Sequence, residues 1–337
     1  MVIAPPTSRY SITRLLAVLE KREVDPATLD LTIFSFMTDD YEWIKERVSE
    51  RGYMIAGGPH PSGDPEGTKR FGFDLVVVGE GESVIEMIAK GERPSGIIKG
   101  EPRRLEEYPP FSIRFKRFGP IELIRGCPHR CTFCQTPKLF GPVRKRPVDD
   151  VIYWMRRLSE FGIRDVRFIA PDGLGYGVSD LKRIFEAKSP GQRIFFGSFP
   201  SEIRPDSVTE EAIGLIKRYC SNRRVIIGAQ AGSDEMLKKI RRGHTTGDVI
   251  QAVRVIRGFD LIPIVDMIFG LPDEERFLPE TIEFLDEITG LGAIIHAHYL
   301  KPLPRTELAG ITPCDTGYLD RHLGRLSARG ELFGRWR

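Results

Sequence analysis

Three cysteines within eight residues are the part of the sequence best suited to chemistry. Cys127, Cys131 and Cys134 follow a C-x3-C-x2-C spacing, so one loop can bring three thiolates to a single inorganic centre. Iron–sulfur clusters usually take four protein thiolates. No fourth cysteine lies nearby, since Cys220 and Cys314 stand alone. A cluster held here would keep one iron open to an outside ligand. Catalytic zinc sites likewise keep one open position, whereas structural zinc sites have four protein ligands.

Two other uses of these cysteines fit the sequence less well than an iron–sulfur cluster. His129 with the three cysteines could form a zinc site, but zinc loops favour paired cysteine arms with a second pair further along the chain, and this sequence has none. A structural disulfide fits poorly, because the three cysteines are odd in number and crowded. The spacing therefore favours an iron–sulfur cluster.

The cysteine loop resembles that of the radical S-adenosylmethionine (SAM) superfamily. It carries the C-x3-C-x2-C spacing, with Phe133 immediately before the third cysteine. The resemblance implies a [4Fe-4S] cluster whose unique iron is chelated by the amino and carboxylate groups of SAM. It also implies that the reduced cluster cleaves SAM to a 5′-deoxyadenosyl radical, with the hard chemistry carried by the cofactors.

Composition describes an ordinary globular protein. The 337 residues are 41% hydrophobic and 29% charged, and the net charge of +3 does not indicate nucleic acid as a partner. The tail is locally basic and contains Arg321, Arg325, Arg329, Arg335 and Arg337. A solvated helix face explains this local charge. We expect no membrane span and a cytoplasmic location, because no long apolar run and no signal-peptide pattern is present.

Residues 1–90 alternate short apolar runs with segments of helical spacing. The pattern predicts strands at 2–4, 31–36, 53–56 and 75–78 and helices at 12–21, 41–50 and 83–89. This alternation is typical of a doubly wound parallel sheet, whose ligands bind at the carboxyl ends of the strands. We expect an abbreviated Rossmann-like domain, because the usual second strand is hard to find between Lys21 and Leu31.

Small and polar residues follow three of these predicted strands: Ser35, Thr38, Gly57, Gly58, His60, Gly79, Glu80 and Gly81. Glycines let the backbone approach a large ligand closely. The order of these loops resembles the cobalamin-binding domain that precedes many radical SAM cores, which implies that they surround the corrin and its nucleotide tail. The D-x-H-x-x-G motif of the better-known cobalamin domains is absent, as it is in many radical SAM relatives. The alternative is a domain retained for packing, with the glycines serving as turns.

The density of Gly and Pro predicts an interdomain linker at 91–118. A second alternating pattern follows, and we expect it to form a partial (β/α)6 barrel at 119–305, with a helical tail at 306–337. Its six predicted strands lie at 121–125, 166–170, 194–197, 225–229, 262–269 and 293–300. The fold class is therefore α/β throughout. In barrels of this shape, reactive groups gather at the carboxyl ends of the strands.

Polar residues stand at several of these strand ends. The segment 121–305 resembles the core of the methylthiotransferase-like and cobalamin-dependent radical SAM branches. By position, the resemblance implies that Phe133 supports the adenine of SAM and that its methionine or ribose part is contacted by Asp172, Glu202, Arg204 and Gln230. The usual G-E-E type sequence is not present after the second strand. Each polar residue could instead cap a helix or pair across a loop.

The whole chain resembles a cobalamin-binding-domain/radical SAM protein of the archaeal type. The resemblance implies methylation of an unactivated carbon in a small-molecule, lipid or peptide substrate. Its cofactors would be the [4Fe-4S] cluster, SAM and cobalamin, and its partner a one-electron reductant such as ferredoxin or flavodoxin.

Three other functions stay open. One is a cobalamin-containing radical SAM enzyme that couples or rearranges carbons without methyl transfer. Another is a tRNA methylthiotransferase, although such enzymes carry a second cysteine-ligated cluster and this chain has no cysteine before Cys127. The third is a non-catalytic metal-binding scaffold.

Overall fold

The computed structural model describes residues 2–3, 9–48 and 52–337, which fall into two compact units. Unit 1 comprises Met1–Pro128, Cys134–Asp150 and Leu303–Ala309, and unit 2 comprises His129–Phe133, Val151–Pro302 and Gly310–Arg337. The predicted strand end at Ala4 and helix end at Glu50 lie outside the described residues. The division passes through the cysteine loop, so that Cys127 and Cys134 belong to unit 1 and Cys131 to unit 2.

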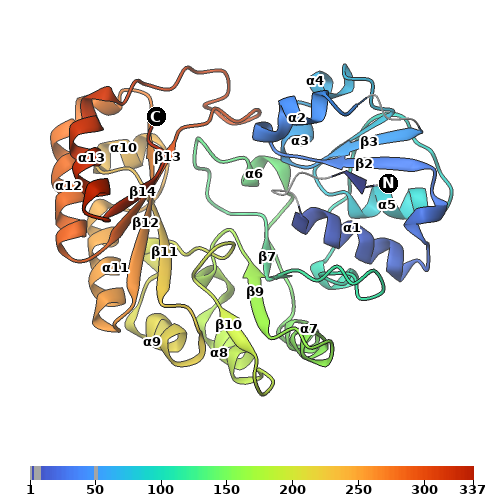
Figure 1. Ribbon diagram of the computed structural model, residues 1–337, viewed down its shortest axis with the longest axis horizontal. Coiled ribbons are helices and arrows are strands. Elements are labelled where there is room, and N and C mark those ends of the chain that lie inside the picture. The colour runs from blue at the N-terminus through green and yellow to red at the C-terminus, as the bar shows by residue number, and fades with distance from the viewer. Residues whose placement is uncertain (1, 4–8, 49–51) are drawn as a thin grey trace. The chain divides into compact units, whose positions relative to one another are not determined.

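Unit 1 contains a parallel sheet with the strand order β1-β2-β3-β4-β5 (Figure 1). The strands are β1 (Val2–Ile3), β2 (Leu31–Ser35), β3 (Tyr53–Gly57), β4 (Leu75–Val78) and β5 (Gly96–Lys99). The first four coincide closely with the predicted strands. The fifth lies inside the stretch 91–118 that we expected to be a linker. Its apolar run is only two residues long and is flanked by Gly and Pro residues. The sequence pattern therefore indicated a linker and not a strand.

Helices cover both faces of this sheet. One apolar cluster packs α1 (Arg9–Lys21) and α5 (Glu82–Ala89) against Ile33, Ile55 and Val77. A second cluster packs α2 (Tyr41–Lys45) against the alternate side chains, among them Phe34 and Val76. Two further helices, α3 (Pro59–Gly63) and α4 (Pro65–Lys69), contact β4. The nearly continuous apolar strands are those of a sheet buried on both sides.

The chain between the two units' main sheets adds short elements to unit 1. After η4 (Leu105–Glu107) come β6 (Ile121–Glu122) and β7 (Ile124–Arg125), which lead into the cysteine loop. Beyond the loop lie α6 (Thr136–Leu139) and β8 (Arg144–Lys145), and β8 pairs antiparallel with β7. The single predicted strand 121–125 is therefore interrupted at Leu123, which is fully buried.

Unit 2 is a partial barrel of parallel strands and helices, as predicted. β9 (Asp165–Ile169) pairs with β10 (Arg193–Phe195), and β11 (Arg224–Gln230) with β12 (Ile262–Phe269) and β13 (Ile294–Tyr299). The chain after β10 continues the barrel, because Ile226 N–H donates to the Gly197 carbonyl at 2.7 Å. The helices are α7 (Val148–Glu160), α8 (Val178–Glu186), α9 (Glu210–Tyr219), α10 (Asp234–Lys239), α11 (Thr246–Gly258) and α12 (Leu278–Gly290). In Figure 1, α11 and α12 lie on one side of β11–β13.

We expected the tail at 306–337 to be helical, but only part of it forms a helix. It forms α13 (Asp320–Ala328) and then β14 (Leu332–Gly334), which pairs parallel with β13. Gly330, with φ of +75°, follows the end of α13. Leu332 is then buried opposite Ile295, so the tail adds a strand to the sheet of unit 2. Three residues of strand carry too little periodicity to be recognised in sequence.

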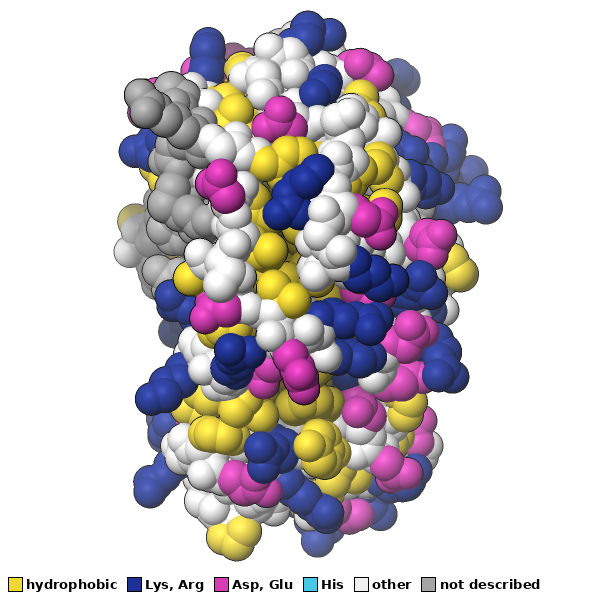
Figure 2. Space-filling model, turned by 90° about the vertical axis from the view of Figure 1, so that its right-hand side faces the viewer, with side chains coloured by type: hydrophobic (Ala, Val, Ile, Leu, Met, Phe, Trp, Pro, Cys, Tyr) yellow, Lys and Arg dark blue, Asp and Glu magenta, His cyan; other side chains and the backbone are white. Residues whose placement is uncertain are grey.

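The surface carries charges of both signs. On the face drawn in Figure 2, Lys and Arg side chains are interspersed with Asp and Glu and with groups of apolar side chains. This mixture accords with the net charge of +3. Among the helices in the described part of the chain, none has the length and apolar character needed to cross a membrane.

Candidate functional site

The cysteine loop begins at a glycine that the backbone requires. Gly126 directly follows β7 and has φ of +82°, and a Cβ atom there would lie 3.0 Å from the Gly141 carbonyl. A residue with a side chain would be strained at this position. Cys131 is buried and Cys127 and Cys134 are half-buried. All five cysteines are described and none of them forms a disulfide.

An arginine in unit 2 donates to one of these thiols. Arg242, shortly after α10, places Nη1 3.5 Å from Cys131 Sγ, and its Nη2 donates to the Gly228 carbonyl at 2.7 Å. The Arg242 carbonyl in turn accepts from Arg204 Nη2 at 2.9 Å. A guanidinium beside a thiolate stabilises negative charge on the sulfur. Sequence reasoning missed this role, and the turn signal Arg242-Gly243 after a short helix was the only local hint.

Hydrogen bonding also holds the loop to unit 2 next to this cysteine. Thr132 N–H donates to the Ile240 carbonyl at the end of α10 at 3.1 Å. Phe133, the residue expected to support adenine, is half-buried. The backbone of the loop and the Arg242 side chain are thus both set by the same turn, at 240–243.

Asp172 and Arg204, two of the residues expected to contact SAM, lie together in unit 2. Asp172 Oδ1 accepts from Arg204 N–H at 3.3 Å, while the Arg204 guanidinium pairs with Asp206 at 2.9 Å. Burial raises the pKa of Asp172, and the Arg204 N–H bond opposes the rise. Burial also lowers the pKa of His129, with the positive charge of Arg204 as the next cause. Arg204 Nη1 is buried without a hydrogen-bond partner, which leaves one donor available to a ligand.

Glu202 belongs to a different group of side chains. Burial raises the pKa of its carboxyl, and the charged groups acting on it are Asp266 of β12 and His298 and His296 of β13. Its carbonyl accepts from Gly173 N–H at 2.9 Å, which ties the loops after β9 and β10 together. The sequence analysis named Glu202 but none of these three neighbours.

Gln230 ends β11 in an unusual backbone conformation. Its φ is +82°, and the pairing of β11 with β12 shifts register between Gly228 and Gln230. Non-glycine residues in this region carry strain that surrounding structure must maintain, and such positions cluster at functional sites. The half-buried Gln230 side chain is therefore held at a defined strand end, and its contact with SAM stays a prediction.

The residues expected to contact cobalamin gather at the carboxyl edge of the unit 1 sheet. Ser35 and Gly57 are partners in the β2–β3 register, and Gly79 N–H donates to Ser62 Oγ at 2.9 Å, which joins the loops after β3 and β4. Gly58 has φ of +101°, and a Cβ atom there would lie 2.9 Å from the Phe36 carbonyl. Ser35 is buried and shares a hydrogen bond with Ser11 at 2.7 Å between the two hydroxyls.

His60 is buried at this edge with one ring nitrogen unsatisfied. Its ring lies against Phe36 and Tyr41, with centroids 5.6 and 4.8 Å away. Nδ1 lies 3.2 Å from Thr38 Oγ1, whereas Nε2 is buried without a partner. Burial lowers the pKa of His60 and so favours the neutral ring. Since buried polar groups are normally hydrogen-bonded, this nitrogen is consistent with a missing ligand atom.

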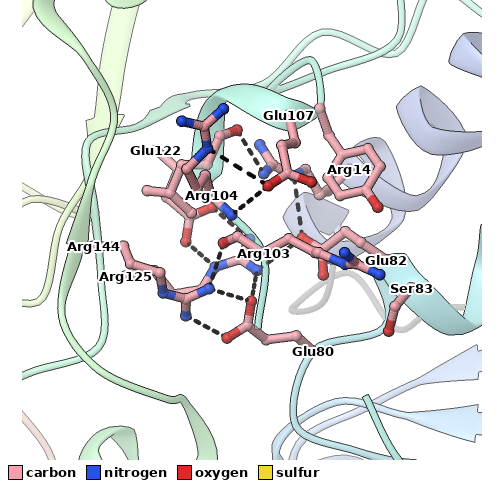
Figure 3. Close-up of polar contacts among 12 residues, drawn as sticks. Arg14, Glu80, Glu82, Ser83, Arg103, Arg104, Glu107, Glu122, Arg125 and Arg144 are labelled. Atoms are coloured by element: carbon pink, nitrogen blue, oxygen red, sulfur yellow. Dashed lines mark hydrogen bonds and ion pairs between the residues drawn. The ribbon is translucent and has the colours of Figure 1, made fainter. Parts of the chain in front are cut away.

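Glu80 takes part in a buried ionic network instead of pointing into open space (Figure 3). Arg125 contacts Glu80 and Glu82 at 2.8 Å each and Glu122 at 2.6 Å, and Arg144 pairs with Glu80. Arg14 of α1 reaches Glu82 at 3.2 Å and donates to the Leu105 carbonyl at 3.1 Å. The arginines lower the pKa of Glu82 to about 2 against the effect of burial. Gly81, at the start of α5, contributes its backbone to the turn between the two glutamates.

This network joins the loop after β4 to the approach of the cysteine loop within unit 1. Arg125 ends β7, two residues before Cys127. The carboxylates of Glu80, Glu82 and Glu122 come from the loop after β4, the first residue of α5 and β6. The Glu80 side chain therefore has a structural partner, and a contact of this residue with cobalamin stays a prediction.

Sequence comparison places a known domain over the barrel segment. Residues 121–285 match the family described as the Radical SAM superfamily. This segment is therefore similar to radical SAM domains. It contains the cysteine loop, Asp172, Glu202, Arg204 and Gln230.

Relatives of the chain include proteins with different names. A tRNA-2-methylthio-N(6)-dimethylallyladenosine synthase of Pelobacter propionicus is 28% identical over 71% of this chain and 56% of its own. An uncharacterized protein of Methanopyrus kandleri is 23% identical over 83% and 67%, and an uncharacterized methyltransferase of Pyrococcus horikoshii is 28% identical over 79% and 65%. The chain thus spans between about half and two thirds of the length of these relatives.

Solved structures resemble the fold of both units. The radical SAM methyltransferase TsrM of Kitasatospora setae, solved with cobalamin and a [4Fe-4S] cluster, superposes with a TM-score of 0.72 over 91% of this chain and 76% of its own, at 18% identity. The cobalamin-dependent SAM radical enzyme OxsB, solved with aqua-cobalamin, gives a TM-score of 0.64 over 82% and 49%, at 19% identity. At these identities the likeness establishes the α/β fold.

Proposed function

We propose that the chain is a radical SAM enzyme that binds a [4Fe-4S] cluster through Cys127, Cys131 and Cys134. The residues fit this cofactor, because the three thiols are free of disulfides and Arg242 donates to Cys131 Sγ. With SAM, the cluster supplies reductive cleavage and hydrogen-atom abstraction. Arg242 stabilises negative charge at the sulfur, and a one-electron reductant such as ferredoxin or flavodoxin would deliver the electron.

SAM would bind at the strand ends of unit 2. Arg204 has a buried donor without a partner, and Asp172 lies beside its backbone. A guanidinium suits the carboxylate of SAM, and a carboxylate suits its ammonium or ribose hydroxyls. Phe133, Glu202 and Gln230 complete the set of proposed contacts.

Cobalamin would bind at the carboxyl edge of the unit 1 sheet. Two features fit a large ligand there: the unsatisfied Nε2 of buried His60, and the close backbone approach at Gly58. When bound, cobalamin supplies a carrier for a methyl group. Ser35, Thr38, Gly57, Gly79, Glu80 and Gly81 line the same edge.

The reaction that we propose is methyl transfer to an unactivated carbon of a small-molecule, lipid or peptide substrate. The observation that carries this proposal is the extent of the likeness to TsrM, which includes both units and 91% of the chain. A relative described as a methyltransferase, from Pyrococcus horikoshii, supports the same class.

The test begins with anaerobic reconstitution using iron, sulfide and hydroxocobalamin, followed by desalting, an ultraviolet–visible spectrum and metal analysis. SAM and a reductant are then added, and 5′-deoxyadenosine and S-adenosylhomocysteine are quantified. We expect about four irons and one corrin per chain, and formation of both products. Cys134→Ala should abolish 5′-deoxyadenosine, whereas Cys220→Ala, which alters a cysteine outside the loop, should not.

Other outcomes assign other functions. Four irons and 5′-deoxyadenosine, with corrin but no S-adenosylhomocysteine, would indicate cobalamin-dependent coupling or rearrangement. A methylthio group on tRNA would indicate methylthiolation, the activity named for the Pelobacter propionicus relative. Zinc without iron would contradict the radical reaction and leave a metal-binding scaffold.

A further inference from the structure

A second group of metal-binding side chains lies on the sheet of unit 2, separate in sequence from the cysteines. Asp266 is on β12, and His296 and His298 are on β13. Asp266 and His296 are direct partners in the parallel register, and His298 stands two residues further along β13. Because side chains of a strand alternate between faces, all three project from the same face of the sheet. The intervening Ala297 is buried, as is Ile295.

The donor atoms of these three residues converge. Each residue offers one atom such that all three atoms lie within 4.8 Å of one another. Asp266 Oδ1 lies 2.9 Å from His296 Nδ1 and 3.7 Å from His298 Nε2. Ligands bound at about 2.0–2.2 Å to one ion stand roughly 3 to 4 Å apart. Small side-chain adjustments would therefore bring all three onto a single ion.

Neighbouring side chains hold the group in place and leave it accessible. The His296 ring stacks on Phe333 of β14, with centroids 4.4 Å apart and planes 12° from parallel. The two imidazoles meet edge to face at 4.0 Å. Asp266 is 17% exposed, His296 30% and His298 45%, so an ion can enter from solvent. Such fixed orientation of imidazole ligands is typical of metal sites.

A second carboxylate adds to the negative charge of the site. Glu202 lies close enough to Asp266 for the two carboxylates to repel one another. A bound cation would offset this repulsion. The attraction of a divalent ion for the pair is thus stronger than for Asp266 alone.

We propose that Asp266, His296 and His298 bind one divalent first-row transition-metal ion, in addition to the cluster at the cysteine loop. Two imidazoles and one carboxylate form the ligand set that holds Fe²⁺ in many oxygenases, and the same donors accept Mn²⁺, Co²⁺ and Zn²⁺. Three protein ligands leave the other coordination positions to water or to oxygen and nitrogen donors of a small molecule. The site lies beside Glu202, so a metal-bound molecule would be held at the proposed SAM-binding strand ends.

The test uses Mn²⁺ as the probe and the full-length, cofactor-loaded protein. The cluster is kept oxidised and the cobalamin as hydroxocobalamin, so that both are diamagnetic and the six-line electron paramagnetic resonance signal counts free Mn²⁺. We expect one bound Mn²⁺ per chain, displaced by Zn²⁺. Asp266→Asn and His298→Ala should each weaken binding by at least about 10- to 100-fold, the loss typical when even a hydrogen-bonding partner of a metal ligand is removed.

Two controls separate this site from other binding. His322→Ala removes a histidine that pairs with a single carboxylate, Asp286, at 3.2 Å, and should leave Mn²⁺ binding unchanged. Cys127→Ala with Cys131→Ala and Cys134→Ala should abolish the iron cluster but keep the Mn²⁺ site. The proposal is overturned if no Mn²⁺ binds. It is also overturned if neither Asp266→Asn nor His298→Ala changes the affinity for Mn²⁺ in variants with unchanged circular dichroism. Either result is independent of SAM cleavage, so it leaves the proposed function untouched.

Discussion

At the scale of single residues, the cysteine ligands could be named from sequence and the groups around them could not. C-x3-C-x2-C spacing is local, so it is readable in a nine-residue window. The bond from Arg242 to Cys131 joins residues 111 positions apart, and the Asp266–His296 pair joins residues 30 apart. Such contacts depend on how strands and turns meet in the fold. The sequence therefore predicted the proposed ligands of the cluster but not the arginine beside it.

Arg242 leads to a prediction about the cluster's reduction potential. Arg242→Gln removes a positive donor from Cys131 Sγ, so the extra electron of the reduced cluster becomes less stable. We expect a more negative potential and SAM cleavage slowed by about 10- to 100-fold, as for other partners of metal ligands. A redox titration followed by electron paramagnetic resonance measures the shift. Arg254→Gln, which alters an exposed pair with Glu287, is the control, and an unchanged potential in Arg242→Gln would contradict the role.

Glu274 leads to a prediction about stability and pH. Its carboxylate accepts from Gly270 N–H at 2.6 Å and Tyr318 Oη–H at 3.3 Å, and burial raises its pKa to about 7. The folded state therefore binds this proton more tightly than the unfolded state does. From about pH 4.5 to pH 7 the free energy of unfolding should fall as pH rises, by roughly 3 kcal/mol in total from this group.

Glu274→Gln removes this titration while keeping an oxygen for the Gly270 bond. As the pH rises from 5 to 8, the unaltered protein should lose unfolding free energy that the variant does not lose. The stability of the variant relative to the unaltered protein should therefore increase. Urea denaturation at several pH values measures it. A difference that does not vary with pH would show that the pKa of Glu274 is the same in the folded and unfolded states.

At the scale of elements, long periodic segments were predicted well and short ones were not. β12 has the predicted bounds Ile262–Phe269, because eight residues bury one face continuously. β5 and β14 were missed, since four and three residues carry little periodicity and their pairing with β4 and β13 supplies the hydrogen bonds. The ionic network around Arg125 could not be predicted either, because its members come from α1, the β4–α5 loop, α5, β6, β7 and β8.

Arg125 tests how strongly this network holds unit 1 together. Arg125→Met leaves the carboxylates of Glu80, Glu82 and Glu122 without their main buried cation. Removing one partner of a buried ionic group typically costs about 3–5 kcal/mol of unfolding free energy. We also expect lower iron retention, because residue 125 leads directly into Cys127. Denaturation and iron analysis measure both effects.

An exposed ion pair provides the comparison for Arg125. Arg193→Gln breaks the pair with Asp165, whose side chains are 60% and 42% exposed, and should cost less than about 1 kcal/mol. Equal losses in the two variants would mean that the buried network adds no more stability than a surface pair.

At the scale of the whole molecule, the proposed function needs two cofactor sites that are built from different loops, although Cys127 and Cys134 share unit 1 with the proposed corrin contacts. The proposed corrin contacts all lie in unit 1, on the loops after β2, β3 and β4, whereas Arg242 and the proposed SAM contacts other than the loop lie in unit 2. Each unit has a sheet and apolar packing of its own. Damage to the corrin edge should therefore leave the cluster intact, and loss of the cluster should leave the corrin edge intact.

Gly58→Val and Cys134→Ala test this independence as a pair. At Gly58 a side chain meets the Phe36 carbonyl and demands a φ of +101°, so we expect at least a tenfold loss of bound corrin with iron near the unaltered value. Cys134→Ala should lose iron and 5′-deoxyadenosine but keep corrin. Gly72→Val is the control, because Gly72 has a similar φ of +96° with nothing within 4 Å of a Cβ atom, and it shares the strain without obstructing the edge. If iron and corrin rise and fall together in every variant, the two cofactors share one site or one folding unit, and the assignment of cobalamin to the unit 1 edge fails.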